Sequence, residues 1–163
     1  MRWLAAALVA AAALAIASPA QARPRVPTPA ECAALIDARD RFAPGVSLRA
    51  IPQIGAGGPA FPQMRLRAIA AHLPSEILPE LETAMARTDR RPVELNCADD
   101  RETDARRGRA FRISLPVFSA DGRWMTLAWF KVDPPVGSEG YQCAFERSAG
   151  RWVARGCELI FIS

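Results

Sequence analysis

Four cysteines constrain the fold of this 163-residue chain more than any other feature of its sequence. They are Cys32, Cys97, Cys143 and Cys157. An even number of cysteines in an exported protein indicates disulfide bonds, whereas cysteines in a reducing compartment more often indicate metal binding or redox chemistry. The sequence has no Cys-x-x-Cys motif and a single histidine, His72, so it lacks closely spaced soft ligands. We therefore expect two structural disulfide bonds, no metal site and no cofactor.

The first 22 residues have the features of an export signal that is removed from the mature protein. Arg2 precedes an uncharged apolar stretch over 3–17, and the small-x-small pattern of residues 20–22 matches a signal-peptidase site. The rival interpretation is an uncleaved membrane anchor, but this stretch would rise only about 22 Å as a helix, against a hydrocarbon core of about 30 Å. We expect a cleaved signal peptide over 1–22, a single disulfide-bonded α+β domain over 23–163, no membrane span after cleavage, and a periplasmic or secreted location.

The C-terminal hairpin predicts how the cysteines pair. Residues 141–162 contain two segments rich in β-branched and aromatic side chains, separated by a turn at Ala-Gly, which indicates two antiparallel strands. A register that sets Ser148 opposite Trp152 also sets Cys143 opposite Cys157, within bridging distance if they occupy a non-hydrogen-bonded pair. The sequence thus predicts one bond across the hairpin and leaves the other two cysteines as the second pair.

The N-terminal half carries helix signals. Residues 28–31 read Thr-Pro-Ala-Glu, a capping box with proline at the first helical position, and predict a helix that continues to about Phe42. Apolar spacing predicts a second helix over 63–73 and a third over 79–87. The proline- and glycine-rich segment between the first two helices is expected to hold a short extended stretch over 46–51.

The last third of the chain has the composition of strands. We expect a short strand over 93–97 and then four longer strands, over 110–118, 123–132, 141–147 and 151–162. In the second of the longer strands, alternation places Trp124 on one face and Trp129 on the other, and both faces are apolar. Such a strand belongs in the middle of a sheet, with helices on one face and other structure over part of the second. The sequence predicts an α+β fold in which two or three N-terminal helices pack on a C-terminal antiparallel meander of about four strands.

Catalytic signals are weak. There is no Gly-x-Ser-x-Gly motif, and Ser75, although close to His72 in sequence, fits a helix boundary better than a catalytic pair. The acidic residues within 100–104 have the spacing of a calcium loop, but Ala105 and Phe111 occupy positions that require Gly and Glu. Four carboxylates of the sheet region would form a general acid–base pair if two of them converged in a pocket. They are Asp133, Glu139, Glu146 and Glu158.

Four aromatic residues of the sheet region are candidates for a ligand-facing surface. They are Trp124, Trp129, Tyr141 and Trp152. On a curved sheet these side chains would line a concavity that holds a small ligand. The competing interpretation is ordinary core packing, because aromatic side chains dominate sheet cores in any case.

The tail of the chain resembles two known groups of proteins. The residues that carry the resemblance are Phe118-Ser119-x-Asp121-Gly122-x-Trp124, Gly137-Ser138-Glu139-Gly140-Tyr141, Gly150-Arg151-Trp152 and a final Ser163. This pattern is similar to that of small exported bacterial proteins with no assigned function, in which a further cysteine-containing turn often stands where this chain has residues 134–137. Helices before a curved sheet, with a late Gly-x-Trp turn, also resemble the cone-shaped α+β proteins of the nuclear transport factor 2 type. Members of that fold include enzymes and binding modules, so the resemblance implies a fold and leaves the function open.

Two functions follow as hypotheses. The first is a non-catalytic exported module, monomeric or weakly oligomeric, that binds a small ligand, an envelope component or another protein. The alternative is a small hydrolase or isomerase that uses the sheet carboxylates or His72 in an apolar pocket. The formal net charge of +4 is a weak bias with both signs interspersed, so we expect no nucleic-acid partner.

Overall fold

A computed structural model describes residues 24–51, 66–88, 91, 93–98, 110–133 and 137–162 of the chain. Three features discussed above lie outside the described residues: the predicted signal peptide, the acidic segment over 100–104 with the spacing of a calcium loop, and residues 134–136, where similar proteins often have a cysteine-containing turn.

Helices precede a single sheet along the chain. The helices are α1 (Pro29–Phe42), the short 3-10 helices η1 (Leu48–Ala50) and η2 (Leu66–His72), and α2 (Ile77–Ala86). The strands are β1 (Phe111–Ile113), β2 (Val117–Phe118), β3 (Trp124–Asp133), β4 (Gly137–Ser148) and β5 (Arg151–Ile162). All strand pairs are antiparallel, in the order β1-β3-β4-β5, with β2 also paired to β3. The predicted α+β class is confirmed.

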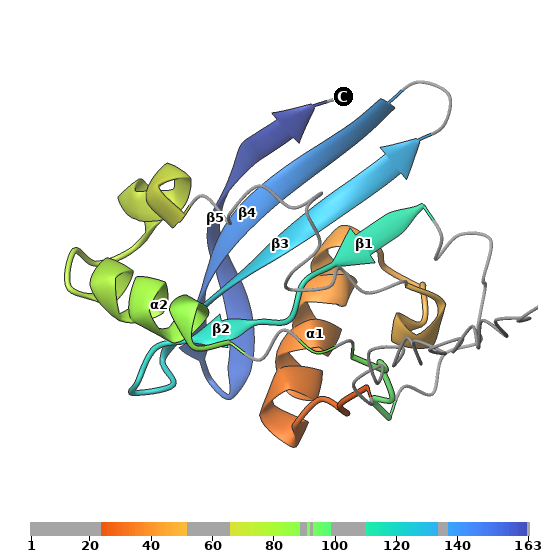
Figure 1. The fold of residues 1–163 in the computed structure, drawn as a ribbon, viewed down its shortest axis with the longest axis horizontal. Helices are drawn as coiled ribbons and strands as arrows, with labels where there is room; N and C mark the ends of the chain where they lie inside the picture. The colour runs from red at the N-terminus through yellow and green to blue at the C-terminus, as the bar shows by residue number, and fades with distance from the viewer. Residues whose placement is uncertain are drawn as a thin grey trace, which may run out of the picture.

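Helices cover both faces of this sheet, as Figure 1 shows for α1 in orange and for η2 and α2 in yellow and green. Alternation along β3 separates the two layers: Met125, Leu127 and Trp129 pack with α1, whereas Trp124 packs with η2 and α2. Strand β3 lies between β1 and β4, so the prediction of a central strand with two apolar faces is confirmed.

The capping box at the start of α1 forms as predicted. The Glu31 backbone N–H donates to the Thr28 hydroxyl and the Thr28 backbone N–H donates to the Glu31 carboxylate, at 3.2 and 2.7 Å. Arg25 adds two hydrogen bonds to the same carboxylate, at 2.9 and 2.6 Å. Burial would raise the pKa of Glu31, but the bonds from Arg25 and Thr28 outweigh it and hold that pKa below its ordinary value.

We expect Glu31→Gln to lower the free energy of unfolding by about 1 kcal/mol at pH 7, because it removes the charged half of the capping box. A carboxyl whose pKa is lower when folded stabilises the protein above its unfolded pKa and loses that effect as the pH falls through the folded pKa. Urea titrations between pH 7 and pH 3 should therefore show the difference between wild type and variant shrinking below about pH 4.5. A difference that stays constant over this range would contradict the assignment.

Four predicted elements differ from the structure in their type or their continuity. The strand predicted over 93–97 is wrong: the segment makes one parallel bridge, Arg25 to Val93, because the disulfide at Cys97 holds it beside α1. The extended stretch predicted over 46–51 instead contains η1, whose Arg49 N–H donates to the Ser47 side chain as an N-cap.

The other two differences involve prolines. The strand predicted over 110–118 divides into β1 and β2, because Pro116 lacks the N–H that a continuous ladder needs. The described part of the helix predicted over 63–73 is the short 3-10 helix η2, which ends just before Leu73-Pro74. The third predicted helix is α2, which begins two residues earlier than expected.

Both disulfide bonds are present, Cys32–Cys97 and Cys143–Cys157. The predicted register is correct at the hairpin cysteines but wrong at the turn. Ser148 pairs with Arg151 across a two-residue turn, and Ala149 and Gly150 both have the positive φ that such a turn requires. A register shift between Ala144 and Phe145 on β4 then brings Cys143 opposite Cys157. This register shift is a β-bulge, and it compensates for a turn that is one residue shorter than the predicted turn.

Candidate functional site

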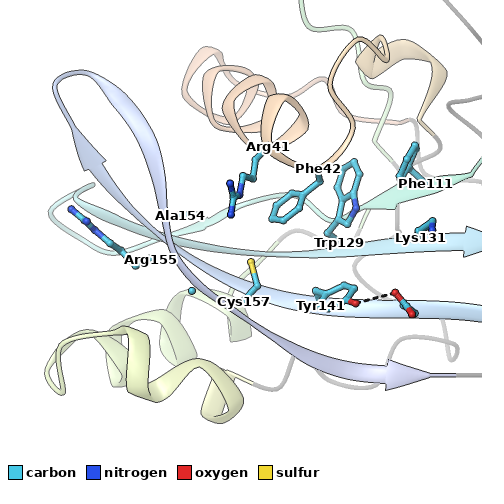
Figure 2. A pocket seen from close by; sticks show the side chains of 11 residues that line it. Arg41, Phe42, Phe111, Trp129, Lys131, Tyr141, Ala154, Arg155 and Cys157 are labelled. Atoms are coloured by element: carbon cyan, nitrogen blue, oxygen red, sulfur yellow. Dashed lines mark hydrogen bonds between the residues drawn. The ribbon is translucent and has the colours of Figure 1, made fainter.

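A cleft of about 510 Å³ opens between the C-terminal end of α1 and the sheet. Figure 2 shows it from close by, with α1 above the strands and the layer of η2 and α2 on the opposite side of the sheet. Its lining comes from the last two residues of α1 and from β1, β3, β4 and β5. The cleft thus forms at the end of α1, where the helix stops and the strands beneath it extend further.

Aromatic side chains make one wall of the cleft. The Phe42 ring stacks on Trp129 with ring centroids 5.3 Å apart, and the Phe111 ring lies at 5.2 Å on the same indole. Phe42 also meets Phe145 edge to face in the core, so the wall continues into the main hydrophobic cluster. Because α1 and two strands fix these rings, the wall exists without a ligand.

Tyr141 and Glu139 form a polar edge of the cleft on β4. The tyrosine hydroxyl donates a hydrogen bond to the Glu139 carboxylate at 2.9 Å, and Figure 2 shows this contact as a dashed line. That bond to an acceptor with a negative charge raises the pKa of the Tyr141 hydroxyl. Tyr141 therefore presents an aromatic ring whose hydroxyl is held by Glu139.

Three cations also line the cleft, and they differ in their partners. Arg155 is bonded to Glu146 at 2.7 Å, and Figure 2 shows its guanidinium directed away from the aromatic wall. Arg123 shares the same carboxylate, and the hydrogen bonds from Arg123 and Arg155 lower the pKa of Glu146. Arg41 and Lys131 are exposed at the two sides of the wall.

The hairpin disulfide forms part of the floor of the cleft. Cys157 lines the cleft and is half-buried, whereas its partner Cys143 is fully buried in the core. The covalent bond fixes β5 against β4 directly below the aromatic wall. Attack on Cys157 by an external thiolate would release a buried Cys143 thiolate, which burial disfavours. The bond is therefore suited to a structural role.

The structure separates the four aromatic residues that the sequence grouped together. Trp129 and Tyr141 line the cleft. Trp124 lies on the opposite face against η2 and α2, and Trp152 packs on Phe118 with centroids 5.5 Å apart, outside the cleft lining. Strand alternation already placed Trp124 and Trp129 on opposite faces, so that signal was available.

Sequence reasoning missed Phe42, Phe111 and Arg41 as site residues. Phe42 and Arg41 end the first helix and Phe111 begins the sheet, 69 residues further on by number. Nothing in the spacing of these residues shows that α1 ends over β1 and β3. Only the packing of helix on sheet brings them together.

His72 lies on the face opposite the cleft. Its Nε2 is 2.8 Å from Oε1 of Glu158, and its ring lies directly over Gly156, where a side chain would overlap it. Ser75 is bonded to Glu76, so the structure does not support the Ser75–His72 pair. Glycine in the interior of β5 is thus explained by the close approach of the imidazole.

The sheet carboxylates have separate partners. Glu139 accepts from Tyr141, Glu146 from two arginines, and Glu158 lies against His72. These three acids therefore do not form a shared acid–base pair. The side chain of the fourth, Asp133, lies outside the described residues.

We expect Gly156→Ala to destabilise the protein by about 2 kcal/mol, because the new methyl group overlaps the His72 ring and the ring must move. In a His72→Ala background the same substitution should cost less than about 0.5 kcal/mol, since the overlap is gone. Urea unfolding of the wild type, the two single variants and the double variant measures the coupling free energy between Gly156 and His72. Equal costs in both backgrounds would show that the imidazole does not contact Gly156 in solution.

Across the described ranges of the chain, no group of three or more His, Cys, Asp and Glu side chains is placed to hold a metal ion. Among the helices of the same ranges, none has the length and apolar content needed to cross a membrane. No protein-family model, curated protein or solved structure matches the chain.

Proposed function

We propose that the protein is an exported, non-catalytic binding module that holds a small ligand in the cleft at the end of α1. The observation that carries this proposal is the aromatic wall of Phe42, Trp129 and Phe111 beside a cleft of about 510 Å³. Small-molecule sites commonly have volumes of about 300 to 1,000 Å³, with apolar walls and a few polar groups that orient the ligand. Tyr141 and Glu139 supply such groups.

Rigidity supports this proposal. The walls belong to α1 and to four strands of the sheet, and a disulfide bond lies in the floor. A cleft that is formed before binding loses little conformational entropy when a ligand enters. The arrangement suits a module that holds its ligand without a large change of shape.

The compartment is consistent with this role. Two disulfide bonds indicate an oxidising location outside the cytoplasm. We place the protein in the periplasm or outside the cell, after removal of a signal peptide over 1–22. We also propose kinship with the small exported bacterial proteins, and with the nuclear transport factor 2 type of cone, that the sequence resembles. Helices that precede a twisted antiparallel sheet support the second relationship.

One contact favours the alternative of a small hydrolase. Glu158 orients the His72 imidazole, which is the arrangement of a general base held by a carboxylate. This pair lies on the face opposite the cleft, so a hydrolase would use a different surface. Hydrolysis of a p-nitrophenyl ester that is lost in His72→Gln and kept when the cleft is blocked would favour the enzyme.

The neutral fluorophore N-phenyl-1-naphthylamine tests the binding proposal. We expect saturable binding of one molecule per chain, with a rise in its fluorescence as it leaves water. Ala154→Phe should abolish this binding because the new ring fills the cleft that Ala154 lines. Val153→Phe is the matched control, since Val153 is the neighbouring residue on the same strand, is 41% exposed and lies outside the cleft lining. Binding that survives Ala154→Phe, or no binding to the wild type, would overturn the proposal.

A further inference from the structure

The charges around the cleft specify which kind of small molecule fits it. We infer that the cleft binds an amphipathic organic anion, with an apolar or aromatic body against Phe42 and Trp129 and its anionic group at the Arg41 guanidinium. This inference rests on the proposed function and adds the chemical class of the ligand.

Arg41 is the cation on which the inference depends. It lies exposed in the last turn of α1, immediately before the ring of Phe42, and Figure 2 shows its side chain extending toward the cleft. Among the residues that the structure describes, no acidic side chain is bonded to it. The guanidinium therefore remains available for a carboxylate, sulfonate or phosphate group, which it can bind with two parallel hydrogen bonds.

The carboxylates nearest to Arg41 along α1 are engaged elsewhere. Asp40 accepts from Arg39 at 2.8 Å. Asp37 accepts from Arg151 at 2.9 Å and from the Trp152 backbone N–H at 2.8 Å. Both acids therefore have cationic partners other than Arg41: that of Asp40 lies on the same helix and that of Asp37 lies on β5.

The remaining charges of the cleft offset one another. Lys131, on the opposite side of the wall from Arg41, lies directly opposite the acid Glu139 in the register of β3 and β4. Arg155 is neutralised by Glu146, so it contributes little. The one acid of the lining, Glu139, receives the Tyr141 hydroxyl. Arg41 is therefore the cation that gives the cleft a positive balance.

Aromatic rings next to a cation define the shape of the ligand. A planar apolar body can lie against the Phe42 and Trp129 rings, and its anionic group then meets Arg41 at the end of the helix. A purely inorganic anion would leave the aromatic wall exposed to water, and a neutral apolar molecule would leave the arginine without an acceptor. The amphipathic anion uses both parts of the site.

The experiment compares two probes that share one skeleton. These are N-phenyl-1-naphthylamine, which is neutral, and 8-anilino-1-naphthalenesulfonate, which carries one sulfonate. We expect Arg41→Gln to weaken binding of the sulfonate about tenfold, which is the loss of one charge-assisted contact, and to change binding of the neutral probe less than twofold. Arg41→Lys, which keeps the charge, should recover most of the affinity for the sulfonate.

A matched variant separates a local effect from general charge. Arg49→Gln removes an exposed arginine outside the cleft and should change sulfonate binding less than twofold. Equal weakening of both probes by Arg41→Gln, or no weakening of either, would overturn the anion inference while the cleft remains a binding site. Failure of the neutral probe to bind the wild type would instead count against the proposed function.

Discussion

Removal of the Cys32–Cys97 bond by the double substitution Cys32→Ala/Cys97→Ala is expected to lower the free energy of unfolding by about 4 kcal/mol. The bond joins residues 65 apart, so its loss frees a long loop in the unfolded chain. It also releases the segment around Cys97 from α1, the helix that covers one face of the sheet. Because native proteins are stable by about 5 to 15 kcal/mol, the variant should be close to unfolding at 37 °C. Urea unfolding monitored by circular dichroism measures the loss.

The hairpin disulfide provides the comparison. Cys143→Ala/Cys157→Ala opens a loop with a separation of only 14, so the expected loss is smaller, about 3 kcal/mol. The two variants should also differ in their binding of N-phenyl-1-naphthylamine. Loss of the hairpin bond should weaken it more, because that bond lies in the floor of the cleft, whereas Cys32 and Cys97 do not line the cleft. Losses below about 1 kcal/mol for both pairs would show that neither bond stabilises the fold.

Arg39→Ala is expected to destabilise the protein by about 3 kcal/mol, although arginines in helices usually lie on the surface and tolerate substitution. Arg39 is only 1% exposed, and its guanidinium donates to the Val46 carbonyl at 2.9 Å as well as to Asp40. Truncation removes the packed aliphatic stem and leaves the buried Val46 carbonyl without this donor.

Two further variants identify the cause of the Arg39 effect. Arg39→Met keeps most of the volume and should cost about half as much, so the remainder measures the lost hydrogen bonds. Arg41→Ala, two residues further along the same helix but exposed, should leave the free energy of unfolding almost unchanged. Urea midpoints of the three variants test this order, and equal midpoints for Arg39→Ala and Arg41→Ala would contradict it.

Local signals explain which parts of the fold were predictable from sequence. The capping box at Thr28 and Glu31 defines the start of α1, because both halves of the motif lie within one turn. Alternation along β3 predicts a central strand. The hairpin cysteines were paired correctly although the turn is one residue shorter than expected, because a bulge restores the register before Cys143.

The site was less predictable because it depends on contacts between distant segments. Residue type alone indicates Tyr141 and Trp129 as ligand-facing candidates, and it groups Trp124 and Trp152 with them. Which aromatic side chains come together depends on the face of the sheet that each one occupies and on the elements packed against that face. The packing in turn depends on where α1 ends relative to β1 and β3. The strand predicted over 93–97 failed similarly, since its local composition suits a strand but the bond to α1 holds it elsewhere.

The connectivity of the two disulfide bonds has a consequence for how the native pairing is reached. The first cysteine of the chain is bonded to the second, and the third is bonded to the fourth. The two cross-linked loops are therefore consecutive and do not overlap. An oxidase that joins cysteines in the order in which they become accessible would give the correct pairs directly, so we expect maturation to proceed without an isomerase.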